Sequence, residues 1–377
     1  MAACATRPPP PASSPGVEPT RTTLAPRARL LGGFAVAAGV LPALNGLAVG
    51  SLSALAYDAA HDRWAAASDE LLTPRLVWLD IALRPSLAVT PTAATRLRLA
   101  PGVPADSLTG LDMEGLALFP DGAFAVSHEG HFDRTQTPRQ PRVLMASRDG
   151  VVTRVVAPRP HFTMQASDRT IGVRHNLGLE SLTRTPDGRL VSGLEQPLGQ
   201  DGPVSNAARG GVIRLLEFVR DAAGRWAPGR EWPYRLEPTP RVPGYQRVCE
   251  DGENGLSDLL ALTDTTLLAV ERACLLGASG APAYNPVRIY EVRLDGADDV
   301  SGLTSLQGHT PTPASKRLVV DLASWRRALP PALARLSNIE GLALGPPGPK
   351  GERTVMLVSD DNFRPSQTTA FIWFALE

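Results

Sequence analysis

The sequence lacks the markers of several common functions. Lysine occurs only at Lys316 and Lys350, and Lys+Arg and Asp+Glu are equal at 38 each, so no net charge attracts nucleic acid or an anionic membrane. The chain contains no G-x-S-x-G, no H-E-x-x-H and no G-x-x-x-x-G-K sequence. A serine-hydrolase elbow, a zinc-binding helix and a phosphate-binding loop therefore have no support.

Regular helical periodicity is also scarce. The best candidate helix, residues 323–336, is interrupted by Pro330-Pro331, which a helix interior does not tolerate. The 36 prolines and 34 glycines suit many short strands joined by tight turns. We therefore expect an all-β protein, and 377 residues are enough for one large β domain.

The N-terminal end has no apolar pattern. Residues 1–27 are rich in proline, serine and threonine and are expected to form a disordered tether before a domain at 28–377. The first four residues, ending in Cys4, are similar to the end of a bacterial lipoprotein signal, although the apolar stretch that normally precedes such a site is missing. Cys4 is therefore either a lipid anchor or incidental.

Charge is absent from residues 30–57, which would suit a membrane span. Glycines and Pro42 interrupt this run, however, and fit two strands and a turn better than one helix. No transmembrane span is expected.

A hairpin pattern recurs five times. Aligned on the residue before the first apolar pair, its anchors are Ser53, Glu114, Glu180, Ser257 and Glu340, separated by 61, 66, 77 and 83 residues. Further strand-like runs follow most hairpins and bring each unit to four strands. This pattern predicts a single β-propeller of five blades, or six if a degenerate blade lies in the inserts. The last unit lacks one strand, which residues 27–36 can supply to close the ring.

Acidic residues occupy both ends of these hairpins. In a propeller the first strand of each blade lines the central channel, so acids at one repeat position converge. Like charges so close repel strongly unless they are protonated or neutralised, and oxygen-only ligands favour calcium over magnesium. Alternatively, the acids accept backbone N–H groups of the neighbouring blade. The metal ligands that we expect are Glu114, Glu129, Glu180, Glu195, Glu271, Glu340, and Asp360 with Asp361; Asp69 or Glu70 holds the corresponding position in the first unit.

Two of the three cysteines bracket one hairpin. Cys249 and Cys274 precede and follow the strand-like runs between residues 256 and 271, so they either lie within bonding distance or are two reduced thiols. If Cys4 is an anchor, the other two pair off. That reading favours an oxidising, extracytoplasmic location, either periplasmic or secreted.

Four phrases of the sequence resemble one known family. They are "MEGLALFPDGAFAVSHE", "NLGLESLTRTPDGRLVSGLEQPL", "GLSDLLALTDTTLLAVER" and "NIEGLALGPPG…LVSDDNF". Together they resemble the phytase-like proteins with esterase-like activity, from about Gly46 to the C-terminus. The resemblance implies a secreted or periplasmic propeller, distantly similar to the calcium-dependent propeller phytases that cleave phosphate monoesters at a calcium-lined channel mouth. Ser53 and Ser257 depart from the glutamate pattern, and Asp258 would compensate for the second serine.

Three functions remain open. The first is a calcium-dependent phosphate-ester hydrolase for a small molecule, acting as a monomer. In it Arg272 holds phosphate in a two-point contact, or else joins two blades, while His128 or His131 protonates the leaving group, or else is a hydrogen-bonded loop residue. The second is a metal-dependent lactonase or esterase. The third is a non-catalytic extracytoplasmic binding propeller.

Overall fold

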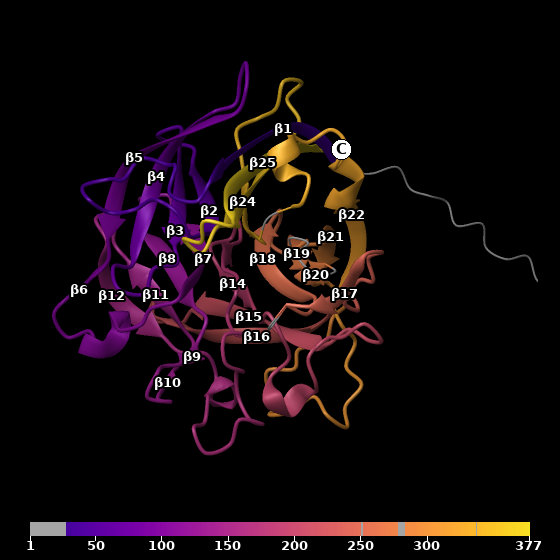
Figure 1. Ribbon diagram of the computed structural model, residues 1–377. Helices are drawn as coiled ribbons and strands as arrows, with labels where there is room; N and C mark the ends of the chain where they lie inside the picture. The colour runs from indigo at the N-terminus through magenta and orange to yellow at the C-terminus, as the bar shows by residue number, and fades with distance from the viewer. Residues whose placement is uncertain (1–27, 250–251, 278–282, 337) are drawn as a thin grey trace, which may run out of the picture.

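The protein is a five-bladed β-propeller. The computed structural model describes residues 28–377 except 250–251, 278–282 and 337. Five sheets, four of four strands and one of five, are arranged in a ring, and all their strand pairs are antiparallel except that of β6 with β12 (Figure 1). The all-β expectation and the count of five blades are confirmed. The expected tether at 1–27 and Cys4 lie outside the described residues.

Each blade is a meander whose first strand lies at the centre of the ring. Blade 1 contains β2 (Leu52–Asp58), β3 (Arg63–Ser68), β4 (Arg75–Ala82) and β5 (Ala88–Arg96). Blade 2 contains β7 (Met113–Leu118), β8 (Phe124–His128), β11 (Arg142–Ala146) and β12 (Val151–Val156), with β6 (Arg98–Leu99) parallel to β12 at its edge. Blade 3 contains β13 (Thr183–Arg184), β14 (Leu190–Gly193), β15 (Val212–Arg220) and β16 (Trp226–Arg235). Blade 4 contains β18 (Gly255–Ala261), β19 (Thr266–Arg272), β21 (Val287–Arg293) and β22 (Ser315–Asp321).

Blade 5 closes the ring with strands from both ends of the chain. It contains β23 (Asn338–Leu344), β24 (Thr354–Asp360), β25 (Thr368–Leu376) and, as outer strand, β1 (Ala28–Ala37). β1 pairs antiparallel with β25 from Ala28 opposite Leu376 to Ala37 opposite Thr368. The expected N-terminal closing strand is therefore confirmed. Such closure joins the first and last parts of the chain and removes an open sheet edge.

The remaining elements are short. Two small sheets pair β9 (His131–Phe132) with β10 (Pro138–Arg139), and β17 (Tyr245–Val248) with β20 (Leu275–Gly277). The 3₁₀ turns are η1 (Ala105–Leu108), η2 (Pro160–Phe162), η3 (Gly199–Asp201), η4 (Leu322–Trp325) and η5 (Pro331–Leu333). Instead of one helix, the segment 323–336, our best helix candidate, thus contains most of η4 and all of η5, and the proline pair stands at the start of η5.

Apolar faces of adjacent blades pack against one another all round the ring. Between blades 1 and 2, for example, Ala65 and Leu76 share a fully buried cluster with Leu111, Phe124 and Leu144. Alternating apolar residues supply this packing, because successive side chains of a strand face opposite sides of the sheet. The burial of these layers fixes the register of each hairpin.

Backbones approach closely at the hub of the ring. A Cβ added to Gly115 in β7 would lie 2.2 Å from the backbone nitrogen of Leu182 in the next blade, so only glycine fits there. Asp258 in β18 is buried at the corresponding position, where its carboxylate accepts hydrogen bonds from the backbone N–H groups of Leu259 and Leu342, each at 2.8 Å. Asp258 therefore joins blades 4 and 5 instead of compensating for Ser257 as a ligand.

Candidate functional site

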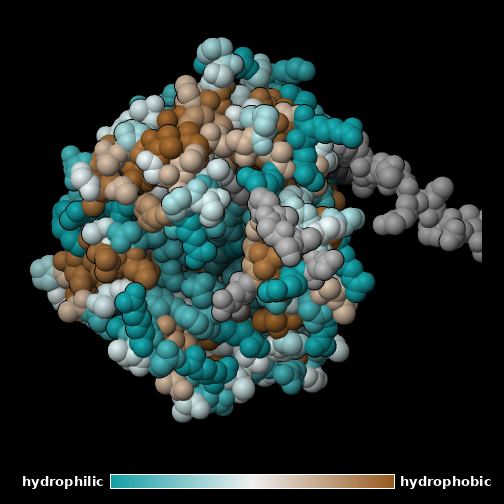
Figure 2. Space-filling model, in the orientation of Figure 1, coloured by the Kyte–Doolittle hydropathy of each residue, from teal (hydrophilic) through white to brown (hydrophobic). Residues whose placement is uncertain are grey.

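The candidate site lies at one end of the central channel, where first strands begin and second strands end. We call this end the mouth. Figure 2 shows a hollow lined by hydrophilic residues at the centre of the ring. The register of the first two strands in each blade determines which side chains reach the mouth. A shift of the register by one residue would turn each side chain to the other face of the sheet.

The second strands contribute one equivalent residue from each blade. In every blade, one residue near the end of the second strand pairs with the residue just before the anchor. Examples are Ser68 opposite Leu52 and Glu271 opposite Leu256. The next residue along each second strand forms what we call the mouth ring. Its members are Asp69, Glu129, Glu195, Arg272 and Asp360.

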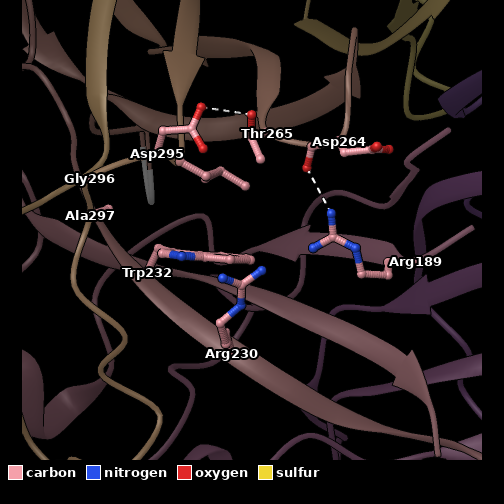
Figure 3. Close-up of a pocket in the computed structure, with 9 residues that line it drawn as sticks. Arg189, Arg230, Trp232, Asp264, Thr265, Asp295, Gly296 and Ala297 are labelled. Carbon is pink, nitrogen blue, oxygen red and sulfur yellow. Dashed lines mark hydrogen bonds between the residues drawn. The ribbon is translucent and has the colours of Figure 1, made fainter. Parts of the chain in front are cut away.

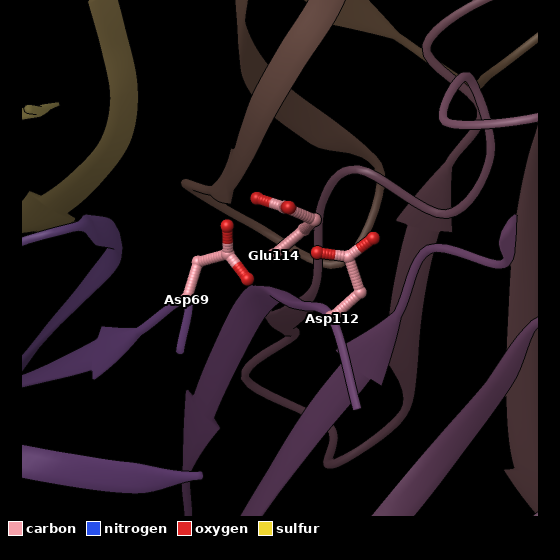
Figure 4. A group of neighbouring side chains, drawn as sticks. All are labelled: Asp69, Asp112 and Glu114. Carbon is pink, nitrogen blue, oxygen red and sulfur yellow. The ribbon is translucent and has the colours of Figure 1, made fainter. Parts of the chain in front are cut away.

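Carboxylates gather in two groups that share one residue. Ligand atoms of Asp69, Asp112 and Glu114 lie within 4.8 Å of one another, and so do those of Glu114, Glu129 and Glu180. Figure 4 shows the first group with its three side chains turned toward one another. Within the described residues, no arginine or lysine pairs with Asp69, Asp112, Glu114 or Glu129, and Asp69 Oδ1 is buried without a hydrogen-bond partner. The two groups are therefore concentrations of negative charge with oxygen donors available to a cation.

Burial and mutual repulsion shift the titration of these groups. Burial raises the pKa of Glu114, and the nearby carboxylates of Glu180 and Asp69 raise it further. The same two causes raise the pKa of Glu129 and of Glu180, and they raise that of Asp360 to about 6. These shifts mean that ionisation of the mouth acids costs free energy unless a cation is bound beside them.

The remaining acids of the mouth follow the same rule with one exception. Burial and neighbouring acids raise the pKa of Asp69 and of Glu340. Burial acts to raise the pKa of Asp112 as well, but interactions with His131 and Asp69 lower it on balance. His131 Nδ1 lies 3.3 Å from Asp112 Oδ2. Asp112 is therefore the acid of this group that is most readily ionised.

Arg272 supplies positive charge on the other side of the mouth. Its Nη2 atom lies 3.3 Å from Glu340 Oε1, 3.5 Å from Glu195 Oε1 and 3.6 Å from Glu180 Oε1. Its Nη1 atom donates a 2.6 Å hydrogen bond to Asn338 Oδ1. The guanidinium thus joins blade 4 to blades 3 and 5. Of the two alternatives that the sequence left open, the contacts are those of the blade-joining role.

Glu271 does not belong to the mouth, and our alignment is one residue off in blade 4. Its carboxylate accepts hydrogen bonds from Tyr234 Oη at 2.7 Å and Asn254 Nδ2 at 2.7 Å, and it pairs with Lys316 Nζ at 2.5 Å. Since Arg272 takes the place in the mouth ring, Glu271 faces the opposite side of the blade. It is not in a position to share a metal ion with the mouth acids.

The two double acids of the sequence separate in the same way. Asp361 accepts hydrogen bonds from the backbone N–H groups of Ser51 at 2.8 Å and Phe363 at 2.9 Å, so it organises a loop next to the mouth and is not one of the gathered acids. Glu70 pairs with Arg75 at 3.0 Å. Asp360 and Asp69 are the members of each pair that lie in the mouth ring.

His128 lies beneath the mouth. It has no exposed surface, its Nδ1 atom lies 3.1 Å from the backbone nitrogen of Asp112, and burial lowers its pKa to about 4. A fully buried neutral imidazole cannot reach a leaving group, so the proposed acid role of His128 is not supported. His131, by contrast, contacts the mouth carboxylate of Asp112.

Sequence reasoning overlooked Asp112 and Asn338 as functional candidates. Both lie two residues before a glutamate anchor, at the same repeat position. Asn338 Nδ2 donates a 2.6 Å hydrogen bond to Glu340 Oε1, while Asp112 completes the first carboxylate group. The signal in the sequence is weak, because the same position holds serine in blade 1 and glycine in blades 3 and 4. The two serine anchors act differently, since Ser257 Oγ donates to the backbone carbonyl of Ile339 at 3.1 Å and Ser53 Oγ donates to that of Met113.

A pocket of about 160 Å³ lies away from the mouth. It is lined by residues of blades 3 and 4 that include Arg189, Arg230, Trp232, Asp264 and Asp295 (Figure 3). Arg189 immediately precedes the strand β14, whose other end reaches the mouth, so this pocket opens at the opposite end of the blades. It contains none of the expected site residues.

Cys249 and Cys274 form a disulfide bond, with their Cα atoms 5.3 Å apart. The bond lies beside blade 4, where the two cysteines come before β18 and after β19. Within the described residues, no helix has the length and apolar character needed to span a membrane.

Comparisons with solved structures give distant similarities. The aldose sugar dehydrogenase of Streptomyces coelicolor is 14% identical with a TM-score of 0.34, covering 93% of this chain and 100% of that chain. The endo-arabinase of Bacteroides thetaiotaomicron is 10% identical with a TM-score of 0.40, covering 89% and 96%. The exo-β-1,3-galactanase of Phanerochaete chrysosporium is 9% identical with a TM-score of 0.44, covering 91% and 65%. Scores this low carry no argument about function.

Comparison with protein families identifies the chain more directly. No curated protein matches it. One family model does match, over residues 47–363, which is nearly the range expected from the four phrases. That family is Phytase-like, described as "Esterase-like activity of phytase", and the chain belongs to it.

Proposed function

We propose that this propeller is a calcium-dependent hydrolase of phosphate esters that acts at the acidic mouth. One observation carries the proposal: two groups of carboxylates, buried except for the half-buried Asp69, share Glu114, and the described residues place no arginine or lysine against Asp69, Asp112 or Glu129. Membership of the phytase-like family supports it. Carboxylates this close together repel one another, and a bound cation offsets that repulsion.

The donors suit a hard divalent cation. Every ligand atom in the two groups is a carboxylate oxygen, and the three residues of each group hold such atoms within 4.8 Å. Calcium accepts six to eight oxygens in irregular geometry, whereas magnesium requires a nearly regular octahedron and zinc prefers nitrogen or sulfur. The buried Asp69 Oδ1 that lacks a partner is an oxygen that a cation would satisfy. Asp69, Asp112, Glu114, Glu129 and Glu180 would therefore hold calcium.

The other mouth residues would shape the site around the ions. Bound calcium would offset charge on phosphoryl oxygens and lower the pKa of an attacking water. Glu195, Glu340 and Asp360 extend the acidic surface, and Arg272 holds the first two in place across the mouth. A small-molecule ester would approach along the channel axis, where the five blades meet.

A second candidate is a metal-dependent esterase or lactonase. The description of the family as esterase-like favours it, and the same carboxylates and ions would serve to polarise an ester carbonyl. The two candidates differ only in the bond that is cleaved. They are therefore separated by substrate and not by the site.

We also propose an extracytoplasmic setting. The Cys249–Cys274 disulfide supports it, because disulfides persist mainly in oxidising compartments. In this proposal residues 1–27 are a tether, with Cys4 as a lipid anchor, and residues 28–377 are the phytase-like domain. Labelling with a radioactive fatty acid, followed by the same labelling of Cys4→Ser, would test the anchor.

The test of function combines melting with turnover. The protein is stripped with EDTA and then supplied with calcium or magnesium. Its melting temperature is measured by calorimetry, and hydrolysis is followed with 4-nitrophenyl phosphate and 4-nitrophenyl acetate. Calcium-dependent phosphate release is the expected result. Turnover of the acetate alone supports the second candidate, whereas no effect of metal and no turnover would leave a binding propeller.

Two variants test whether the activity lies at the mouth. Glu180→Gln removes one ligand and should lower calcium affinity and the rate of phosphate release together. Glu217→Gln is the matched control, because Glu217 is also buried but pairs with Arg189 and Arg230 in blade 3, away from the mouth. Loss of stability in Glu180→Gln with unchanged calcium affinity would count against a ligand role.

A further inference from the structure

The mouth ring contains one cation among four acids. Blades 1, 2, 3 and 5 contribute Asp69, Glu129, Glu195 and Asp360, and blade 4 contributes Arg272 at the equivalent place. The Arg272 side chain is only 12% exposed. A lone arginine at a repeated acidic position places a fixed positive charge where the other blades place negative charge.

The contacts of Arg272 resemble those of a coordinated cation. One nitrogen, Nη2, lies 3.3 to 3.6 Å from carboxylate oxygens of Glu340, Glu195 and Glu180. These three acids belong to the blades on either side of blade 4. The guanidinium therefore neutralises several converging carboxylates at once, which is what a divalent ion does at a shared oxygen site.

The acids of the mouth are consequently divided into two halves. Asp69, Asp112, Glu114 and Glu129 form the half without an arginine or lysine partner among the described residues, and Glu195 and Glu340 form the half that Arg272 neutralises. Asp360 lies beside Glu340 and belongs to neither carboxylate group. Glu180 lies between the halves, because it belongs to a carboxylate group and also contacts Arg272. The two halves have similar donors and differ chiefly in this one side chain.

We infer that Arg272 takes the place of a metal ion, so that it limits the number of ions that the mouth holds and confines them to the half built by blades 1 to 3. The inference rests on the proposed function in requiring that the mouth binds divalent ions. Glu195 and Glu340 are then partners of Arg272, not metal ligands. Removal of the guanidinium opens an additional cation site among Glu180, Glu195 and Glu340.

The first test counts ions in Arg272 variants. EDTA-stripped protein is titrated with calcium chloride by calorimetry, and bound calcium is measured by mass spectrometry after gel filtration. Arg272→Gln should bind one more ion per chain than the wild type, and Arg272→Lys, which keeps the charge, should bind the wild-type number. Folding of each variant is checked by circular dichroism. An unchanged number of ions in folded Arg272→Gln overturns the inference.

A second pair of variants serves if Arg272→Gln does not fold. Glu129 and Glu195 occupy equivalent places in the mouth ring, but only Glu195 contacts Arg272. Glu129→Gln should lower the number of bound ions or weaken their binding at least 10-fold, whereas Glu195→Gln should leave both unchanged. Equal loss in the two variants overturns the inference while leaving the proposed function intact. A wild-type protein that binds no ion at all would instead refute the metal site itself.

Discussion

Glu271 and Arg272 are consecutive residues of β19 that serve opposite sides of blade 4. Arg272 reaches the mouth and contacts Glu340 at 3.3 Å, while Glu271 lies between blades 3 and 4, where it contacts Tyr234 and pairs with Lys316. The alternation of side chains along a strand accounts for the difference. One of these charges belongs to the candidate site, and the other belongs to the scaffold.

Glu271→Gln should therefore reduce stability and leave metal binding unchanged. The substitution removes the buried charge that faces Lys316 and weakens the hydrogen bonds from Tyr234 and Asn254. The expected loss is about 2–3 kcal/mol of unfolding free energy, measured by urea denaturation. A fall in the number of bound calcium ions without loss of stability would return Glu271 to the list of ligands.

Glu114→Gln should weaken calcium binding more than the loss of any other mouth acid. Glu114 is the residue common to both carboxylate groups, so the substitution removes an oxygen from each. We expect calcium affinity to fall at least about 10-fold, since even outer-shell changes commonly cost this much. The metal-free variant should be as stable as the wild type or more so, because one repelling carboxylate is gone. Glu217→Gln is the control, and equal affinities in the two variants would exclude Glu114 as a shared ligand.

The sequence was sufficient for the architecture because the signals for it are repeated. Five hairpins with the same apolar pairs predicted five blades, and the missing strand of the last unit predicted the closing strand β1. These features depend on many residues at once. An error at one position does not alter them.

The same reasoning could not decide which of two adjacent charges faces the mouth. Asp69-Glu70, Glu271-Arg272 and Asp360-Asp361 each offer two candidates, and the period of two in a strand makes one residue decisive. The pairing of β2, β18 and β23 with their partners is also shifted next to the anchors, between Leu256 and Asp258 for example. A bulge adds a residue on one strand only, and nothing in a single sequence marks where it falls.

Metal-free protein should lose stability as pH rises through the range of the mouth acids. The folded pKa values of Glu114, Glu180 and Asp360 lie above the unfolded ones, so the folded state binds more protons, and that contribution is complete below about pH 4 and lost above the folded pKa. For Asp360, with a pKa of about 6, the change is about 3 kcal/mol between these limits. We expect a higher melting temperature at pH 5 than at pH 7.5 after EDTA treatment.

Calcium should reverse this trend, because binding requires deprotonated ligands. The increase in melting temperature caused by calcium should be larger at pH 7.5 than at pH 5, and it should shrink in Glu114→Gln at both values. The opposite result would be a stability of the metal-free protein that rises steadily from pH 5 to pH 7.5. It would show that repulsion between the mouth acids does not destabilise the folded state.

Gly115→Ala tests whether the hub positions the mouth. The added Cβ would lie 2.2 Å from the backbone nitrogen of Leu182 and 2.5 Å from the carbonyl carbon of Ser181, so blades 2 and 3 would have to separate. Overpacking against backbone should lower the unfolding free energy by about 3 kcal/mol or more. Since Gly115 follows Glu114, the displacement should also weaken calcium binding. Gly302→Ala is the matched control, because no atom lies within 4 Å of its added Cβ, and its effect should stay within about 0.5 kcal/mol. The contrary outcome is equal stability and equal calcium affinity in the two variants. It would mean that the blades can separate at the hub without moving the carboxylates. The close approach of the backbones would then not set the geometry of the site.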